Sequence, residues 1–377
     1  MKIGIVCYPT FGGSGVVATE LGIALADKGH EIHFITYRQP VRLNALSRNI
    51  YFHEVFVEEY PLFKFQPYEL ALSSKLVEVV KQYQIEILHV HYAIPHAYAS
   101  YMAKQMLKED GYEIPIITTL HGTDITLVGS HPNYKTAVEF SINNSDVVTA
   151  VSKSLRADTL RLFNVRKEIE VIYNFIDFEK YAVQDIKDCK RDTLAADDEK
   201  IITHVSNFRP VKNIADVIDI FFKIQQKIPS RLLMVGDGPE SEAAELQVKD
   251  LAIEDKVLFL GNSDEIDKIL SFSDLFILPS KTESFGLAAL EAMAAGTPVI
   301  SSNTGGLPEV NLHGETGFLS NVGDIEEMAK NAISILEDDQ RLATFKANAR
   351  NFAQRFSLEK VLPVYEDMYK EVRAKCC

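Results

Sequence analysis

Short apolar runs alternate with longer segments of helical periodicity along most of the chain. Such alternation is typical of βαβ units, in which crossover helices join parallel strands. Residues 16–28 predict a helix that ends at Gly29, because glycine commonly follows a helix C-terminus. The strands predicted in the first half are 2–8, 31–36, 85–90, 114–120 and 146–151, and those in the second half are 201–205, 231–235, 257–260, 275–278 and 299–301.

A polar, acidic segment at 177–200 separates the two series of strands. We therefore predict an α/β protein of two Rossmann-like domains, each with an open parallel sheet. The predicted domains are 1–174 and 175–357, with a hinge near 174–178 and a final helix at 358–377. Ligands of such sheets bind beyond the carboxyl ends of the strands, so one domain could bind a donor and the other an acceptor.

Composition narrows the class of protein. The chain has 377 residues, of which 46% are hydrophobic, and can therefore bury two cores. A formal net charge of −14 argues against nucleic acid as the main partner, because phosphate backbones bind basic surfaces. No apolar stretch reaches the roughly 20 residues that span a bilayer, so we expect a soluble cytoplasmic protein. The cysteines lack metal-ligand spacing and should be reduced thiols; they are Cys7, Cys189, Cys376 and Cys377.

The most specific motif is the segment TESFGLAALEAMAAGTPV at 282–299, which carries Glu283 and Glu291 eight residues apart. We predict a strand-exit loop followed by a helix at 285–295. Eight helical residues advance about 12 Å, which is close to the span from the hexose to the ribose of a nucleotide-sugar. Unpaired amides at the helix start would attract the diphosphate, and they belong to Phe285, Gly286 and Leu287. The alternative is that Glu283 only interacts with the helix dipole and Glu291 is solvated.

This motif resembles that of retaining, family-4 glycosyltransferases of the GT-B fold. The resemblance covers essentially the whole chain and includes the segments 171–177 and 236–239. It implies two Rossmann-like domains that face a cleft, with the C-terminal helix crossing back to the first domain. It also implies a UDP-sugar donor, whose sugar hydroxyls Glu283 would fix and whose ribose Glu291 would bind, with Ser284 in the same donor site.

A glycine-rich loop at 11–15 follows the first predicted strand and precedes the first helix. The family resemblance implies that the backbone amides of Gly13 and Ser14 face the donor diphosphate. The same loop also fits the loose dinucleotide pattern G-x-G-x-x-A, and Arg38 could meet a 2′-phosphate. Nicotinamide binding is therefore the alternative for this loop.

Two cations, Arg209 and Lys212, follow the first strand of the second domain. Cations in this position could stabilise the charge that develops on departing UDP, and in the family the matching residues bind the diphosphate. The alternative is a solvated basic turn. No Asp-x-Asp triplet occurs in the sequence, so we expect a metal-independent enzyme without a cofactor.

Histidines gather at two predicted strand ends. His89 and His91 share one face of a strand, and His121 follows the next strand. In the resembled family the corresponding histidine contacts the transferred sugar, which implies a catalytic role for His121. For His89 and His91 we expect core positions, and a zinc site built from all three histidines is the alternative. The resemblance also places Asn174 near the donor and the backbone of Asn262 beside the uracil.

Three blocks, at 1–15, 89–96 and 119–126, narrow the resemblance to one branch of the family. That branch transfers N-acetylglucosamine from UDP-GlcNAc to the hydroxyl of L-malate, in the first step of bacillithiol synthesis, and releases UDP. Malate is a dianion, so its site should offer hydrogen-bond donors and a cation. The candidates are Tyr92, Thr119, Thr123 and Asn174 as donors and Arg42 and Lys64 as cations.

One position departs from that branch, because Glu139 precedes Phe140 where malate-using relatives tend to carry Arg. A carboxylate there could not bind malate. The alternatives are a related retaining transferase with a lipid or inositol-type acceptor, which aromatic residues within 56–65 favour, and a UDP-GlcNAc 2-epimerase, which the paired glutamates disfavour. A non-catalytic nucleotide-sugar-binding protein is a further alternative, and a homo-oligomer is possible.

Overall fold

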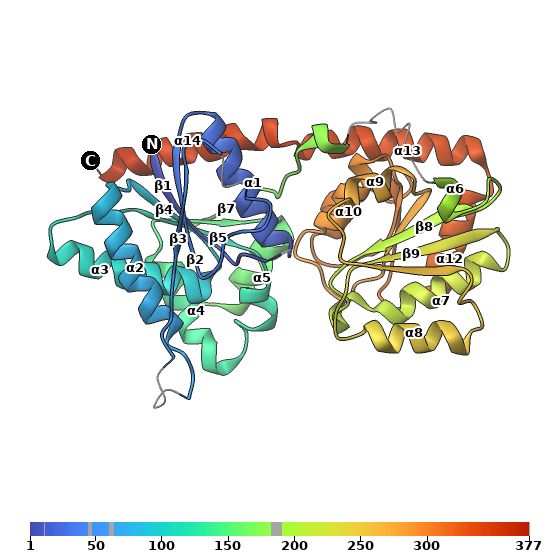
Figure 1. Cartoon of the computed structure of the whole chain (residues 1–377), viewed down its shortest axis with the longest axis horizontal. Helices are drawn as coiled ribbons and strands as arrows, with labels where there is room; N and C mark the ends of the chain where they lie inside the picture. The colour runs from blue at the N-terminus through green and yellow to red at the C-terminus, as the bar shows by residue number, and fades with distance from the viewer. Residues whose placement is uncertain (11, 44–46, 60–63, 182–190, 377) are drawn as a thin grey trace. The chain divides into compact units, whose positions relative to one another are not determined.

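The computed structural model describes residues 1–10, 12–43, 47–59, 64–181 and 191–376. The chain divides into two compact units (Figure 1). The first unit comprises Met1–Phe175 with Leu358–Cys377, and the second comprises Ile176–Ser357. The division falls within the predicted hinge at 174–178.

The first unit is built on a seven-stranded parallel sheet in the order β3-β2-β1-β4-β5-β6-β7. Its strands are β1 (Lys2–Val6), β2 (Glu31–Thr36), β3 (Ile50–Glu54), β4 (Ile87–His91), β5 (Ile116–Leu120), β6 (Val147–Ala150) and β7 (Ile169–Val171). Its helical segments are α1 (Gly13–Asp27), α2 (Tyr68–Tyr83), η1 (Ala93–Ala97), α3 (Tyr98–Glu109), η2 (Thr123–Leu127), α4 (Pro132–Asn144), α5 (Lys153–Leu162) and α14 (Leu358–Cys376).

The second unit has a six-stranded parallel sheet in the order β10-β9-β8-β11-β12-β13. Its strands are β8 (Lys200–Val205), β9 (Ser230–Val235), β10 (Val257–Gly261), β11 (Leu275–Leu278), β12 (Val299–Ser302) and β13 (Gly317–Ser320). Its helical segments are η3 (Phe178–Tyr181), α6 (Arg191–Leu194), η4 (Pro210–Lys212), α7 (Ile214–Gln225), α8 (Ser241–Asp250), α9 (Ile266–Ser271), α10 (Leu287–Ala294), α11 (Leu307–Val310), α12 (Ile325–Leu336), α13 (Asp339–Ala353) and η5 (Gln354–Phe356).

Strand order reverses once in each sheet. In the first unit β2 and β4 pair with opposite edges of β1, and in the second unit β9 and β11 flank β8 in the same way. The helices that connect strands on one side of the central strand therefore cover one face of the sheet, and those on the other side cover the opposite face. The loops at the carboxyl ends of the two adjacent central strands run in opposite directions as a result. We call these two places the β1/β4 switch point and the β8/β11 switch point.

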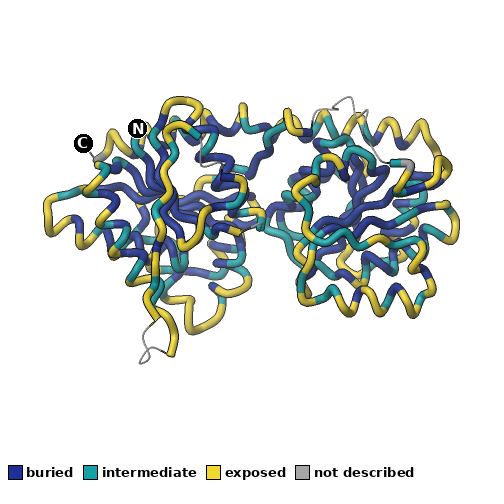
Figure 2. The backbone as a smooth tube through the Cα atoms, viewed as in Figure 1, coloured by how far each residue is buried: buried dark blue, intermediate teal, exposed yellow. Residues whose placement is uncertain are grey.

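Both sheets form the buried interior of their units (Figure 2). Every residue of the central strands β4, β5 and β11 is buried, as expected for parallel strands covered by helices on both faces. All ten predicted strands are present, and the prediction missed β3, β7 and β13. Each missed strand lies at an edge of its sheet and is short or contains polar residues, so its apolar signal is weak. The edge strand β10 was predicted because its sequence is a continuous apolar run.

Helix α14 packs on the first unit, as the family resemblance implied. It contributes the fully buried rings of Tyr365 and Tyr369, and the Tyr369 hydroxyl lies 2.7 Å from Nδ1 of His89 on β4. Near its end, Arg373 Nη2 forms an ion pair with Glu86 at 2.7 Å. Figure 1 shows this helix, in red, on the same unit as β1. None of the helices among the described residues is long and apolar enough to span a membrane.

Candidate functional site

The loop after β1 leads directly into helix α1 at the β1/β4 switch point. Gly12 is the N-cap of α1 and brings no side chain to the amides of Gly13 and Ser14. Gly15 lies so close to the preceding loop that a Cβ atom would be 2.5 Å from the carbonyl oxygens of Tyr8 and Thr10. Only glycine fits there. Phe11 of the predicted glycine-rich loop lies outside the described residues.

Tyr92, the first residue after β4, joins this loop to the neighbouring strand. Its hydroxyl is 2.6 Å from Oγ of Ser14, and its backbone N–H donates to the carbonyl of Thr119 at 2.9 Å. Its φ of 90° is unusual for a residue with a side chain. A strained residue that is held from two sides is typical of a functional site.

His121 follows β5 and completes this group. Its Nε2 lies 2.8 Å from His91 Nδ1, and its ring centroid is 5.1 Å from that of Tyr92. Burial lowers the pKa of His121 to about 3, so the imidazole is neutral near physiological pH. The structure thus brings the predicted residues Ser14, Tyr92 and His121 together at one switch point.

Asp124 fixes the backbone beneath this group. Its carboxylate accepts N–H bonds from Ala93 at 2.8 Å, from Gly122 at 2.9 Å and from His121 at 3.3 Å. Burial raises the pKa of Asp124 to about 6, although the backbone N–H groups favour the ionised form. The sequence analysis did not select Asp124. The sequence feature that could have identified it is an aspartate three positions after a histidine at a strand end, because an aspartate there can accept hydrogen bonds from the backbone N–H groups of the loop.

The prediction that Thr119 binds the acceptor is not supported by its position. Thr119 is 1% exposed, and its Oγ1 lies 2.8 Å from both His89 Nε2 and Thr149 Oγ1. Its hydroxyl is therefore used inside the sheet. Thr123 lies at the first position of η2 and is half-buried, so it remains a candidate.

The two candidate cations of the first unit have different surroundings. Arg42 Nη1 forms an ion pair at 2.6 Å with Glu20, whose side chain is buried on α1, so its charge is already balanced. Lys64 is exposed, with Nζ 5.5 Å from the ring centroid of Phe65. Tyr60, Leu62 and Phe63 of the neighbouring stretch lie outside the described residues, as do Cys189 and Cys377.

Histidines of β4 bond to other side chains. His89 lies between Tyr369 and Thr119, and His91 lies beside His121. Among the described residues no group of three or more His, Cys, Asp or Glu side chains could hold a metal ion. Core positions for His89 and His91 are confirmed, since both are fully buried.

At the β8/β11 switch point, Lys212 and Glu283 contact each other directly. Lys212 Nζ donates to Glu283 Oε1, and Ser280 Oγ donates to the same oxygen at 2.9 Å. Lys212 ends η4 after β8, whereas Glu283 lies in the loop after β11. The two residues that were assigned to diphosphate and sugar thus form one partly buried ion pair.

Arg209 lies on the same loop, but it is exposed. Phe208 and Asn213 bracket η4 with φ values of 29° and 57°. These left-handed residues turn the chain sharply on either side of the loop. Arg209 and Lys212 therefore lie in a compact turn that follows the end of β8.

The loop that carries Glu283 is held by glycines from the segment after β12. Gly306 N–H donates to the Glu283 carbonyl at 2.9 Å, and a Cβ atom on Gly305 would lie 1.8 Å from that oxygen. Gly305 also has a φ of 55°. The sequence analysis did not identify these glycines as a support for the Glu283 loop. Two adjacent glycines were the sequence feature that could have indicated a close approach of two backbone segments.

Helix α10 begins at Leu287 and ends at Ala294, so the predicted helix at 285–295 was too long. Gly286 is its N-cap with φ 98°, and a Cβ atom there would lie 2.6 Å from Leu307 Cδ2. Phe285 precedes the helix, and its buried ring packs edge-on against Phe356 at 5.7 Å. Because Glu283 also precedes the helix, the span of eight helical residues does not describe its separation from Glu291.

Glu291 lies within α10 and is 8% exposed. The alternative of a solvated Glu291 is therefore wrong. Ser284 is half-buried beside Glu283, and Asn262 is exposed one residue after β10. In the first unit, Asn174 is 6% exposed, and among the described residues its buried Oδ1 has no hydrogen-bond partner.

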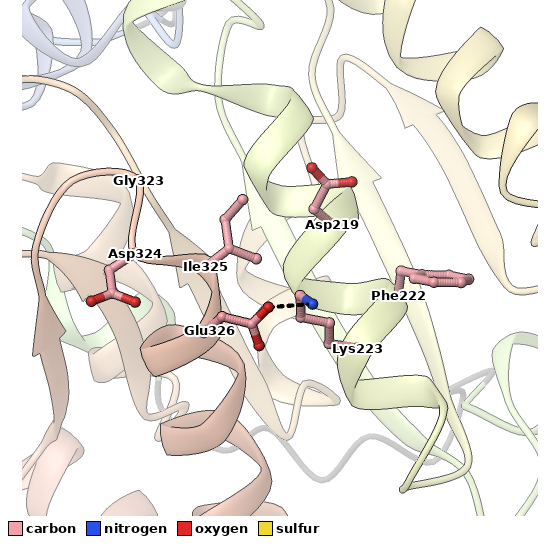
Figure 3. Close-up of a pocket in the computed structure, with 7 residues that line it drawn as sticks. All are labelled: Asp219, Phe222, Lys223, Gly323, Asp324, Ile325 and Glu326. Atoms are coloured by element: carbon pink, nitrogen blue, oxygen red, sulfur yellow. Dashed lines mark ion pairs between the residues drawn. The ribbon is translucent and has the colours of Figure 1, made fainter.

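A separate pocket of about 450 Å³ lies between α7 and the start of α12 (Figure 3). Lys223 and Glu326 form an ion pair at 2.6 Å at this place. The lining residues are Asp219, Phe222, Lys223, Gly323, Asp324, Ile325 and Glu326. They include none of the predicted site residues, so we assign the pocket no role.

Comparison with known proteins matches both halves of the chain to transferases. Residues 11–180 match Glycosyltransferase Family 4, and residues 185–352 match Glycosyl transferases group 1. The chain is 50% identical over 373 residues to N-acetyl-alpha-D-glucosaminyl L-malate synthase of Bacillus anthracis, with 99% of this chain and 97% of the relative covered. The chain belongs to the family-4 glycosyltransferases.

Solved structures of glycosyltransferases have the same fold. Anabaena HepE in complex with UDP and glucose superimposes with a TM-score of 0.82 at 23% identity, covering 98% of this chain and 99% of that chain. Sucrose-phosphate synthase from Thermosynechococcus elongatus gives 0.81 at 22% identity, with 99% of each chain covered. The predicted GT-B fold, with two Rossmann-like parallel-sheet domains, is confirmed.

The departure at Glu139 has a local structural explanation in this glycosyltransferase. Its Oε1 accepts the backbone N–H of Asn164 at 3.0 Å, which ties α4 to the loop after α5. The carboxylate thus stabilises the surface of the first unit.

We predict that this glycosyltransferase loses stability as the pH falls below 6.5. Burial lowers the pKa of several histidines from 6.5, to about 3 for His89 and His121 and to about 4 for His96. Between the folded and unfolded pKa values the unfolded chain binds more protons, so acidification favours unfolding by about 1.4 kcal/mol per pH unit for each histidine. Asp124, whose pKa is raised from 3.8 to about 6, offsets part of this between those two values.

Urea unfolding between neutral pH and about pH 5 measures this slope. The variant His96→Phe should show a shallower slope, because one buried imidazole is removed. Replacement of the exposed His313 by Gln is the matched control and should leave the slope unchanged. An unfolding free energy that stays constant over this range would contradict the prediction.

Proposed function

We propose that this glycosyltransferase moves N-acetylglucosamine from UDP-GlcNAc to the hydroxyl of L-malate, the first step of bacillithiol synthesis, and releases UDP. The observation that carries the proposal is the 50% identity, over nearly the full length of both chains, to the Bacillus anthracis protein of that name. We further propose that the protein acts in the cytoplasm on small-molecule substrates.

The groups at the β8/β11 switch point suit the donor. Arg209 and Lys212 would bind the diphosphate, and Glu283 would accept hydrogen bonds from the sugar hydroxyls. In the structure Lys212 is the cationic partner of the partly buried Glu283 carboxylate. The ribose would bind Glu291, while the N-terminus of α10, with Ser284, Phe285, Gly286 and Leu287, would lie near the phosphates and Asn262 near the uracil.

The groups at the β1/β4 switch point suit the acceptor and the transferred sugar. Tyr92 and Thr123 offer hydroxyls to malate, and His121 offers one imidazole nitrogen to a sugar hydroxyl. The buried amide oxygen of Asn174 needs a donor, which a substrate hydroxyl could supply. For the malate cation we favour Lys64, because Arg42 is paired with Glu20.

The reaction that we propose retains the α configuration. The acceptor hydroxyl oxygen bonds to the anomeric carbon from the face that UDP leaves, the bond from that carbon to the phosphate oxygen breaks, and this oxygen takes the hydroxyl proton. No protein nucleophile is required. The chain then accelerates transfer by positioning the reactants and by stabilising charge on the leaving group.

We expect the chain to convert UDP-GlcNAc and L-malate to an α-linked product and UDP. D-malate should react poorly, because a reacting atom misplaced by about 1 Å can cost roughly 100-fold in rate. UDP release and the NMR coupling of the anomeric proton are the measurements. A β linkage, or reaction with an inositol or lipid acceptor but not with L-malate, would overturn the assignment.

Arg209→Ala and Lys212→Ala should each lower the turnover number, by about 10²- to 10³-fold, since the missing charge matters most as UDP departs. Circular dichroism should show that both variants keep the fold. Lys227→Ala, an exposed lysine of the same unit, is the control and should retain full turnover. Near-native rates for both loop variants would show that this loop does not bind the leaving group.

Saturating EDTA should leave the rate of UDP release unchanged. The physical reason is that cations and helix amides already balance the diphosphate charge without a bridging metal. Loss of activity that Mg²⁺ or Mn²⁺ restores would refute metal independence. That result would not affect the assignment of donor and acceptor, which product analysis tests separately.

A further inference from the structure

The contact between His91 and His121 determines which nitrogen of His121 carries a proton. His91 is fully buried, and its Nδ1 lies 2.8 Å from His121 Nε2. The ring planes differ by 25°, and the ring centroids are 5.1 Å apart. Burial lowers the pKa of both residues, and two neutral imidazoles share one proton across this contact.

Only two arrangements of that proton are possible. If His121 Nε2 carries it, His91 Nδ1 accepts, and the single proton of His91 must sit on its Nε2. Among the described residues this buried Nε2 has no hydrogen-bond partner, so it would be an N–H without an acceptor. Orphaned buried N–H groups are rare because they lose a full hydrogen bond to water. In the other arrangement His91 Nδ1 carries the proton and donates it to His121 Nε2. The Nε2 of His91 is then bare, which means that it carries no proton.

His96, in the same cluster, shows that a bare buried nitrogen is tolerated here. Its Nδ1 lies 2.5 Å from the carbonyl oxygen of His91, which can only accept, so His96 must donate from Nδ1. Its buried Nε2 is then bare, and among the described residues this atom also has no hydrogen-bond partner. The forced tautomer of His96 is thus the one that we assign to His91.

We propose that His91 is a positioning residue that donates from Nδ1 to Nε2 of His121 and thereby holds His121 in its Nδ1–H tautomer. His121 then presents an N–H donor, rather than a bare nitrogen, to whatever binds beside Tyr92. In the proposed function, on which the kinetic part of this inference rests, that donor meets an oxygen of the transferred sugar. A positioned donor aids transfer only when its direction is fixed.

The tautomer can be read directly in the ligand-free protein. Two-bond ¹H–¹⁵N spectra of ¹⁵N-histidine-labelled protein distinguish protonated from bare ring nitrogens, and the His121 signals are those lost in His121→Asn. We expect His121 with a protonated Nδ1 and a bare Nε2. His121 with a protonated Nε2 would overturn the proposal, whether or not the chain acts on malate.

Two substitutions at position 91 test the donor itself. In His91→Asn the amide nitrogen lies near the place of Nδ1, so the variant should keep the His121 tautomer and most of the turnover. In His91→Gln the amide lies near the place of Nε2, so His121 should lose its fixed tautomer. The kcat of His91→Gln should fall about 10- to 100-fold at unchanged KM for UDP-GlcNAc.

His89→Gln is the matched control, because His89 is equally buried on the same strand face but bonds to Tyr369 and Thr119. It should leave the His121 tautomer unchanged. Equal losses in His91→Asn and His91→Gln, or the same tautomer change in His89→Gln, would show that His91 acts only as a core residue. If neither position 91 variant folds, the spectrum of the unmodified protein still decides the proposal.

Discussion

The reversal of strand order in each parallel sheet is the constraint on which the site depends. Crossovers between parallel strands are right-handed. Connections that run toward one edge of the sheet therefore cover one face, and connections that run toward the other edge cover the opposite face. The loops after β1 and β4, and those after β8 and β11, therefore separate and leave strand ends uncovered. Ser14, Tyr92, Lys212 and Glu283 all lie at these ends, although they are far apart in sequence.

Burial then decides the charge state of the groups that gather there. Around β4 and β5 desolvation favours neutral imidazoles, so hydrogen bonds rather than ion pairs organise His91, His96 and His121. In the second unit the partly buried Glu283 keeps a cationic partner in Lys212. The first unit thus offers neutral imidazoles that form directional hydrogen bonds. The second unit offers the Lys212–Glu283 ion pair, which a charged ligand could rearrange.

The fold alone does not identify the substrates of a protein. Sucrose-phosphate synthase and HepE superimpose on this chain over nearly its full length at identities below 25%. The scaffold therefore does not select the acceptor, and the strand-end loops must do so. This is why the proposed acceptor depends on the close relative rather than on the fold, and why Glu139 matters less once its bond to Asn164 is known.

Hydrophobic periodicity alone determined most of the secondary structure, because a central strand such as β11 is a continuous apolar run whose burial the sequence records directly. It missed β3, β7 and β13, which are short or contain polar residues. The motifs also selected His121, Lys212 and Glu283. Only the tertiary structure decided how these residues pair, because the Lys212–Glu283 and His91–His121 contacts join strands that are adjacent in the sheet but distant in the chain. Local sequence carries no signal for such contacts.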